Sequence, residues 1–89
     1  MTRTKRPKNS VEALEFIGAV RRMLRAASIR VAAADEHELR ALLALRTDLD
    51  AAITTAVQGQ RSYGRSWAYI ALATGTTRHA AFQRWRGTE

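Results

Sequence analysis

Apolar residues recur at intervals of three and four over most of residues 10–58, and this spacing constrains the fold more than any other feature. Side chains at this spacing lie on one face of an α-helix. A first helix is expected to begin near Ser10, because serine caps helix N-termini well, and to end near Ser28 to Val31. Its apolar stripe consists of Ala13, Ile17, Val20, Leu24 and Ala27, widened by Phe16 and Met23.

A second long helix is expected from about Asp35 to about Gly59. Asp35 and Glu38 have the spacing of a capping box, in which two side chains accept hydrogen bonds from the first N–H groups of a helix. Two long amphipathic helices joined by a short loop predict a long antiparallel helical hairpin. The stripe usually forms a core, and its width leaves room for a dimer interface. It consists of Leu39, Leu42, Leu43, Leu49, Ala52, Ile53, Ala56 and Val57, with Leu45 lying to one side.

The rest of the chain adds two short helices and no sheet, because no segment alternates apolar and polar residues. We therefore expect an all-α fold of four helices: the hairpin over 10–58, a turn-rich hinge at Gly59–Arg65, and a helix-turn-helix over 65–87. These form one folded domain over 10–89. Residues 1–9 carry four basic side chains and no apolar periodicity, and are predicted to be a basic flexible arm.

Residues 66–87 read SWAYIALATGTTRHAAFQRWRG. Ser66 and Thr77 are each placed to cap a short helix with the side-chain hydroxyl. Gly75 lies between these two helices, where a sharp turn requires a positive φ that glycine adopts without strain. The residues expected to face inward are Trp67, Ile70, Ala71, Ala81 and Trp85.

The outer face of the second short helix predicts contact with DNA bases. Spacing of 100° per residue places His79, Gln83 and Arg86 opposite Ala81 and Trp85. Glutamine pairs with adenine and arginine with guanine in the major groove, so helix 77–86 is expected to enter that groove. Phe82, at the edge of this face, is expected either to touch a thymine methyl group or to pack on a neighbouring helix. The full predicted base-reading set is His79, Gln83, Arg86, Arg78 and Phe82.

A second set of residues is expected to contact phosphates, which position such a helix on the duplex. Its members are basic or hydroxyl side chains around the two short helices and basic side chains of the arm. A solubilising tail explains the basic residues of the arm about as well as phosphate contact does. The set consists of Arg61, Arg65, Ser66, Thr77, Arg84, Arg3, Lys5, Arg6 and Lys8.

These residues resemble the helix-turn-helix of small actinobacterial and phage DNA-binding proteins, with the pattern S-W-x-x-I-A-x-x-x-G-x-[ST]-R-x-A-A-x-x-R-[WF], and are similar to region 4 of sigma factors. The resemblance implies DNA binding in transcriptional control and names no target. Two positions depart from the pattern: Tyr69 stands where glutamate is common, and Thr76 stands where an aliphatic residue is favoured. The matching residues are Ser66, Trp67, Ile70, Ala71, Gly75, Thr77, Arg78, Ala80, Ala81, Arg84 and Trp85.

The formal charge of +7 is distributed unevenly. Residues 1–30 carry +6, residues 31–58 carry −3 and residues 59–89 carry +4. Basic ends around an acidic middle suit a scaffold flanked by segments that contact a polyanion. A charge that serves only solubility is the alternative, and the excess of arginine over lysine is also typical of a GC-rich genome.

Other classes of protein are disfavoured. The chain has no cysteine, and His37 and His79 are too few for a zinc site, so we expect no metal and no cofactor. No paired carboxylates, phosphate-binding glycine loop or activated nucleophile is present, so we expect no enzyme. Neither a secretory signal nor a membrane-spanning run is found, which predicts a cytoplasmic, nucleoid-associated protein without a small-molecule ligand.

The leading hypothesis is a bacterial or phage transcriptional regulator, repressor-like, that binds a specific double-stranded DNA sequence as a homodimer through the 10–58 helices. One alternative is a protein-interaction module of the polymerase-binding or antirepressor type. Another is an architectural or recombination-directionality protein, which shares the DNA chemistry of the first.

Overall fold

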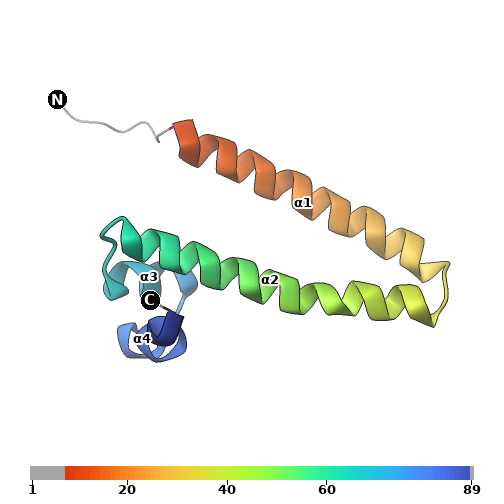
Figure 1. Cartoon of the computed structure of the whole chain (residues 1–89). Helices are drawn as coiled ribbons and strands as arrows, with labels where there is room; N and C mark the ends of the chain where they lie inside the picture. The colour runs from red at the N-terminus through yellow and green to blue at the C-terminus, as the bar shows by residue number, and fades with distance from the viewer. Residues whose placement is uncertain (1–7, 89) are drawn as a thin grey trace. The chain divides into compact units, whose positions relative to one another are not determined.

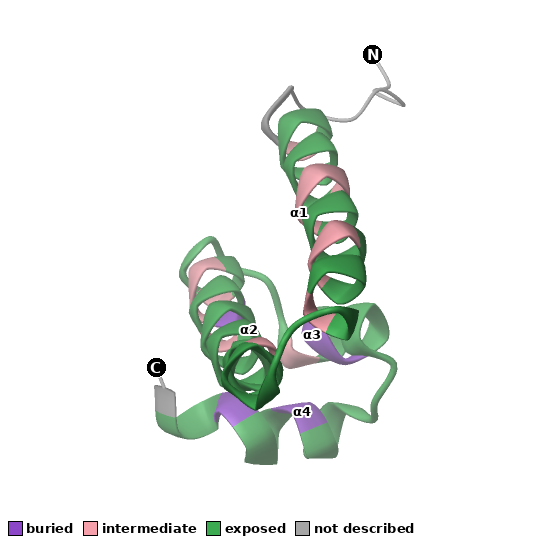
Figure 2. Cartoon of the chain, turned by 90° about the vertical axis from the view of Figure 1, so that its right-hand side faces the viewer, coloured by how far each residue is buried: buried purple, intermediate pink, exposed green. Residues whose placement is uncertain are grey.

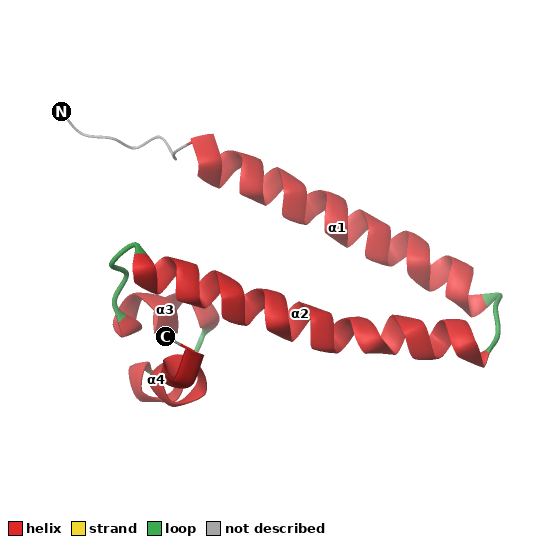
Figure 3. Ribbon diagram, in the orientation of Figure 1, coloured by secondary structure: helices red, strands yellow, loops and turns green. Residues whose placement is uncertain are grey.

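The computed structural model describes residues 8–88 of the chain, with side chains described for residues 10–87. This part contains four α-helices, a short 3-10 helix and no strand (Figures 1 and 3). The predicted all-α fold is confirmed: a helical hairpin of two long helices is followed by two short ones. The helices are α1 (Lys8–Ala32), α2 (Glu36–Ser62), α3 (Trp67–Thr74) and α4 (Arg78–Trp85), and the 3-10 helix is η1 (Arg86–Thr88).

The two long helices are longer than predicted. Ser10 lies inside α1, because a capping preference does not stop a helix where the preceding residues can also be helical. Gly59 lies inside α2, since glycine only weakens a helix interior. The end of α2 is set by Gly64, whose φ of +92° takes the chain out of the helix, and Gly64 N donates to Arg61 O over 2.9 Å. The predicted hinge at Gly59–Arg65 is therefore confined to its last three residues.

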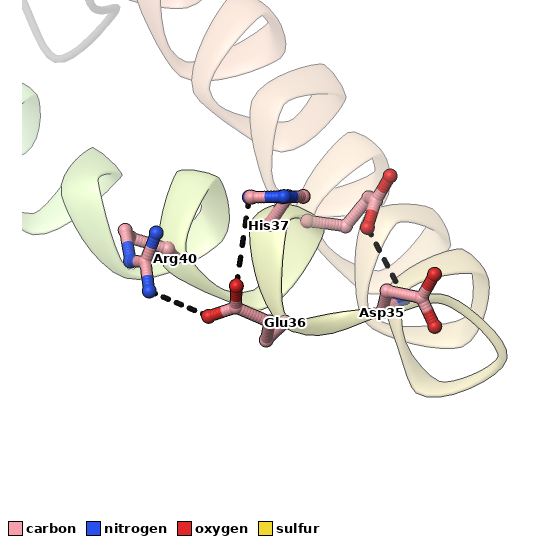
Figure 4. A network of polar contacts seen from close by, with 5 residues as sticks. Asp35, Glu36, His37 and Arg40 are labelled. Carbon is pink, nitrogen blue, oxygen red and sulfur yellow. Dashed lines mark hydrogen bonds and ion pairs between the residues drawn. The ribbon is translucent and has the colours of Figure 1, made fainter.

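The start of α2 shows half of the predicted capping box. Glu38 Oε1 accepts a hydrogen bond from Asp35 N over 3.1 Å. Glu36 adds an ion pair with Arg40 one turn further on, and its other carboxylate oxygen lies 3.7 Å from His37 Nδ1 (Figure 4). All of these side chains are solvent-exposed, so they fix where the helix begins and add little to stability.

The described chain divides into two compact units between Leu43 and Ala44. The first unit contains α1, the connection over residues 33–35 and the first two turns of α2. The connection is tight: Ala34 N donates to Val31 O over 2.9 Å. Val31 and Leu42 are half-buried, but no described residue of this unit is fully buried. Most of the large apolar side chains of α1 therefore remain exposed.

The second unit contains the only fully buried side chains among the described residues. They come from the end of α2, from α3 and from α4 (Figure 2). Trp67, which is partly buried, packs against them. Ala81 is completely inaccessible, which allows α3 and α4 to approach closely. The inward positions predicted for the two short helices are confirmed, with Trp67 half-buried. The buried residues are Val57, Ile70, Ala71, Ala81 and Trp85.

The apolar stripe of α2 contributes less to a core than its pattern suggests. Of that stripe only Val57 is buried, because the core of the second unit reaches α2 only near its C-terminal end. Leu49 and Ile53, in the same unit, remain exposed. Leu39 and Leu43, in the first unit, are also exposed.

Candidate nucleic-acid interface

A tight turn joins α3 to α4. Gly75 adopts a φ of +72° and a ψ of +28°, the left-handed conformation that ends many helices. Gly75 N and Thr76 N both donate to Ala71 O, so the last turn of α3 closes on itself. Thr74 Oγ1 donates to Ile70 O over 2.8 Å, and it lies 3.2 Å from Thr76 Oγ1. The direction in which the chain leaves α3 is thus fixed by local hydrogen bonds.

Both short helices are capped as the sequence predicts. Ser66 Oγ accepts a hydrogen bond from Tyr69 N, and Thr77 Oγ1 accepts one from Ala80 N, each over 3.0 Å. The two capping residues have extended backbones, as N-caps do. A glutamate in place of Tyr69 would complete a capping box with Ser66, but α3 begins at Trp67 without it.

The two faces of α4 differ sharply in exposure. Ala81 and Trp85 are buried in the core of the second unit. His79, Gln83 and Arg86 are exposed, with Arg86 in the first residue of η1. A helix anchored on one side and open on the other can present its outer side chains to a groove.

An aromatic contact joins the N-terminal half of α3 to the middle of α4. The rings of Trp67 and Phe82 meet edge to face, with centroids 5.6 Å apart and planes at 89°. Phe82 remains 37% exposed. The predicted alternatives for Phe82 are therefore compatible, because the same ring packs on α3 and keeps an open edge.

Four arginines of the predicted DNA-contacting set lie over aromatic rings. The guanidinium carbon of Arg61 is 4.5 Å from the centroid of Trp67, and that of Arg86 is 5.6 Å from Phe82. Such stacking restricts a flexible side chain while its N–H groups can still donate at their edges. The other two pairs are Arg65 with Tyr69, at 5.1 Å, and Arg84 with Trp85, at 5.3 Å.

Arg61 also has a structural role that its sequence position did not indicate. It is half-buried, and Arg61 Nη1 donates to Arg65 O over 2.8 Å. This hydrogen bond spans the turn between α2 and α3. Arg61 therefore holds the N-terminal end of α3 as well as carrying charge beside it.

A surface hollow lies within the second unit, where the end of α2 and the N-terminal ends of α3 and α4 meet. Its lining includes two arginines and a histidine, and no acidic side chain among the described residues. Basic side chains and the exposed N–H groups of a helix start suit an anionic group such as a phosphate. The lining residues are Arg61, Ser66, Trp67, Ala68, Arg78, His79 and Phe82.

The predicted site is thus brought together in part. Five predicted residues line the hollow: Arg61, Ser66, Arg78, His79 and Phe82. Gln83 and Arg86 lie on the open face of α4, and Thr77 begins that helix. Of the arm residues, Arg3, Lys5 and Arg6 lie outside the described residues, and Lys8 is described only as the first residue of α1.

The sequence pattern predicts no DNA-contacting role for Trp67, Ala68 and Tyr69. Trp67 and Ala68 line the hollow, and Tyr69 supports Arg65. The contact between Arg65 and Tyr69 could have been predicted, because residues four apart lie side by side on a helix, as Phe82 and Arg86 also do. The hollow could not, because residues from three separate helices line it and no sequence pattern brings them together.

Within residues 10–87, no group of three or more histidine, aspartate or glutamate side chains is placed to hold a metal ion. None of the described helices is both long enough and apolar enough to cross a membrane. Comparisons with protein-family models, curated proteins and solved structures give no match for this chain.

Proposed function

We propose that this chain binds a specific sequence of double-stranded DNA and acts as a repressor-like transcriptional regulator. In this proposal α3 and α4 form a helix-turn-helix of the kind that small actinobacterial and phage proteins use, and α4 enters the major groove. The observation that carries the proposal is the two-sided character of α4. Ala81 and Trp85 anchor it, while His79, Gln83 and Arg86 face solvent.

The exposed side chains supply the chemistry of base recognition. Gln83 has a donor and an acceptor that match the major-groove edge of adenine, and Arg86 has paired donors that match guanine. Arg86 lies over Phe82, so part of the ordering cost of its side chain is met before DNA binds. Phe82 offers an apolar edge to a thymine methyl group.

Phosphate contacts would hold α4 in register. Arg61 and Arg78, which line the hollow, supply positive charge near the start of both short helices. In helix-turn-helix proteins the first helix of the motif crosses the DNA backbone, which is the place that α3 would occupy here. Arg65 and Arg84, each held over an aromatic ring, add charge on either side.

The proposal includes a homodimer through the helices of residues 10–58. One recognition helix covers few base pairs, and two-fold pairing of half-sites is the usual way to gain affinity and specificity. It also includes a role without catalysis or cofactor, in the cytoplasm and on the nucleoid.

A protein-interaction module is the second candidate, and one observation favours it. Leu72, on α3, is 84% exposed, the highest value for a large apolar side chain in the described residues. Tyr69, three residues earlier on the same helix, is 46% exposed, so the two side chains together offer an apolar surface to another protein.

The test is selection of bound fragments from a random DNA pool, followed by affinity measurement for single variants. Gln83→Ala and Arg86→Ala should each cost about 1–3 kcal/mol on the selected sequence and relax the preference at one position. Gln60→Ala is the matched control, because Gln60 is an exposed glutamine on α2 that does not line the hollow. That variant should bind like the unchanged protein.

Two results would contradict the proposal. If the pool shows no enrichment, the protein-interaction module gains support instead. If Gln83→Ala and Arg86→Ala weaken binding to random and selected DNA equally, these residues do not read bases.

A further inference from the structure

One face of α1 carries large apolar side chains that its own unit leaves uncovered. Phe16 is 68% exposed and Met23 is 63% exposed. At 100° per residue they lie beside, and not within, the stripe of Ile17, Val20 and Leu24. The residues that share their face, all within about 80° of one another, form what we call the α1 side face: Glu12, Phe16, Ala19, Met23, Ala26 and Arg30.

The residues of the α1 side face are complementary when two copies of the helix are aligned antiparallel. Glu12 and Arg30 are equally distant from position 21, at opposite ends of the face. The same holds for Phe16 with Ala26 and for Ala19 with Met23. Each of the three pairs joins an acid with a base or a large side chain with a small one.

We propose that the α1 side face binds the same face of a second copy of this chain, with the two helices antiparallel and the two-fold axis level with position 21. A two-fold axis makes every contact reciprocal, so Glu12 meets the partner's Arg30 at both ends of the contact. Phe16 fills the space above the partner's Ala26, and Met23 fills that above the partner's Ala19. The paired segments span about 27 Å of helix.

Charge decides the direction of this pairing. Parallel helices in the same register would place Glu12 beside the partner's Glu12, and Arg30 beside the partner's Arg30. Like charges at that distance repel, whereas the antiparallel arrangement gives two ion pairs. The antiparallel arrangement also separates the two copies of Phe16, which would otherwise crowd each other.

This inference rests on the homodimer within the proposed function and specifies its contact surface. Other occupants of the α1 side face are a different protein or another part of the same chain. Both of these predict a full-length chain that stays monomeric on its own, so they are outcomes of the test below.

The first test measures self-association of the full chain without DNA by analytical ultracentrifugation over a range of concentrations. Met23→Glu should raise the dimer dissociation constant by at least about tenfold, because the two-fold axis places the buried carboxylate in the contact twice. Leu14→Glu is the matched control. Leu14 is 54% exposed on the same helix but lies about 160° around it from the side face.

Circular dichroism of each variant verifies that α1 still forms. A folded Met23→Glu variant that dimerises as strongly as Leu14→Glu would overturn the proposal. A chain that is monomeric at every concentration would overturn it as well.

The second test exchanges the end charges. Glu12→Arg and Arg30→Glu should each weaken the dimer, by about tenfold, since each change replaces two attractive contacts with two repulsive ones. The double variant with both changes should return to within about threefold of the unchanged protein. Failure of the double variant to recover would show that the two residues do not face each other.

The third test reads the direction of the helices. The chain has no cysteine, so single cysteines can be introduced without side reactions. A mixture of Ala19→Cys and Met23→Cys chains should form mainly the mixed disulfide, because these two positions are opposed. Disulfides between identical chains alone would indicate a parallel pair and overturn the proposal.

None of these measurements uses DNA, so the two proposals can fail separately. A dimer that follows all three expectations but selects no DNA sequence contradicts only the DNA-binding proposal. Sequence selection by a chain that remains monomeric contradicts the dimer contact and the homodimer of the proposed function, and leaves DNA binding by α4 standing.

Discussion

At the scale of single residues, Gly75 has the most direct effect on the turn between α3 and α4. Its φ of +72° is a conformation in which any side chain with a Cβ is strained. A Cβ built there meets no atom within 4 Å, so the strain would come from the backbone alone.

Gly75→Ala is therefore expected to lower the free energy of unfolding by about 1–2 kcal/mol. Gly59→Ala is the matched control, since Gly59 is helical and its added Cβ also meets nothing. That change should raise the free energy of unfolding by about 0.5–1 kcal/mol, because alanine loses less entropy in a helix. Urea unfolding measures both, and equal effects of the two substitutions would contradict the role given to Gly75.

Residues whose structure depends on near neighbours could be predicted from the sequence. Ser66, Gly75 and Thr77 act within four residues of themselves, and each adopts the expected conformation. Ala81 and Trp85 follow from helical periodicity. The position of Arg61 over Trp67 could not be predicted, because the turn between them determines it.

At the scale of elements, the close approach of α3 and α4 depends on a side chain with almost no volume. Ala81 is fully inaccessible, whereas its neighbour Ala80 is exposed. Ala81→Leu should cost about 1–3 kcal/mol of stability, because three more carbon atoms must force the two helices apart. Ala80→Leu should change stability by less than about 0.5 kcal/mol.

The same pair of variants separates anchoring from DNA binding. Under the proposed function, Ala81→Leu should also weaken binding to the selected DNA at a temperature where the variant is folded, since α4 is displaced. Binding is measured by fluorescence anisotropy. Unchanged affinity in a destabilised Ala81→Leu variant would argue against recognition by α4.

Helix lengths were harder to predict than helix positions. The sequence indicates where α2 becomes polar and glycine-containing, near Gly59. In the structure α2 continues to Ser62, and the chain leaves the helix at Gly64, where φ becomes positive. A glycine permits a helix to end but does not require it. Gly59 lies inside α2 and Gly64 lies beyond its end, and the hydrogen bonds that distinguish them cannot be read from the sequence.

At the scale of the whole molecule, and under the proposed function, the basic character of the chain should determine how affinity for DNA responds to salt. Residues 1–9 carry four basic side chains, Arg3, Lys5, Arg6 and Lys8. Each phosphate neutralised adds about 0.9 to the slope of log affinity against log salt. A chain that begins at Ser10 should therefore show a slope smaller by up to about 4.

The control is the same measurement on a full-length chain in which the four basic residues are replaced by glutamine. Its slope should match that of the truncated chain, since charge and not length is at issue. If both variants keep the original slope, the arm is a solubilising tail.

The burial pattern of the long helices could not be predicted from periodicity. The stripe along α2 predicts a buried face, yet Val57 is its only buried member. Periodicity indicates which side chains share a face and does not state what covers them. Leu49 and Ile53 lie on that stripe and remain exposed.

The separation of buried and exposed side chains on α4 has a consequence for how such a gene can diverge. The side chains that hold the helix, Ala81 and Trp85, are not the ones it exposes. Substitutions at His79, Gln83 or Arg86 should therefore change stability little. Under the proposed function, descendants of this gene could then acquire new DNA targets without first gaining stability. Phe82 is the exception, because its ring both packs on Trp67 and keeps an exposed edge, so a substitution there would change stability and DNA preference together.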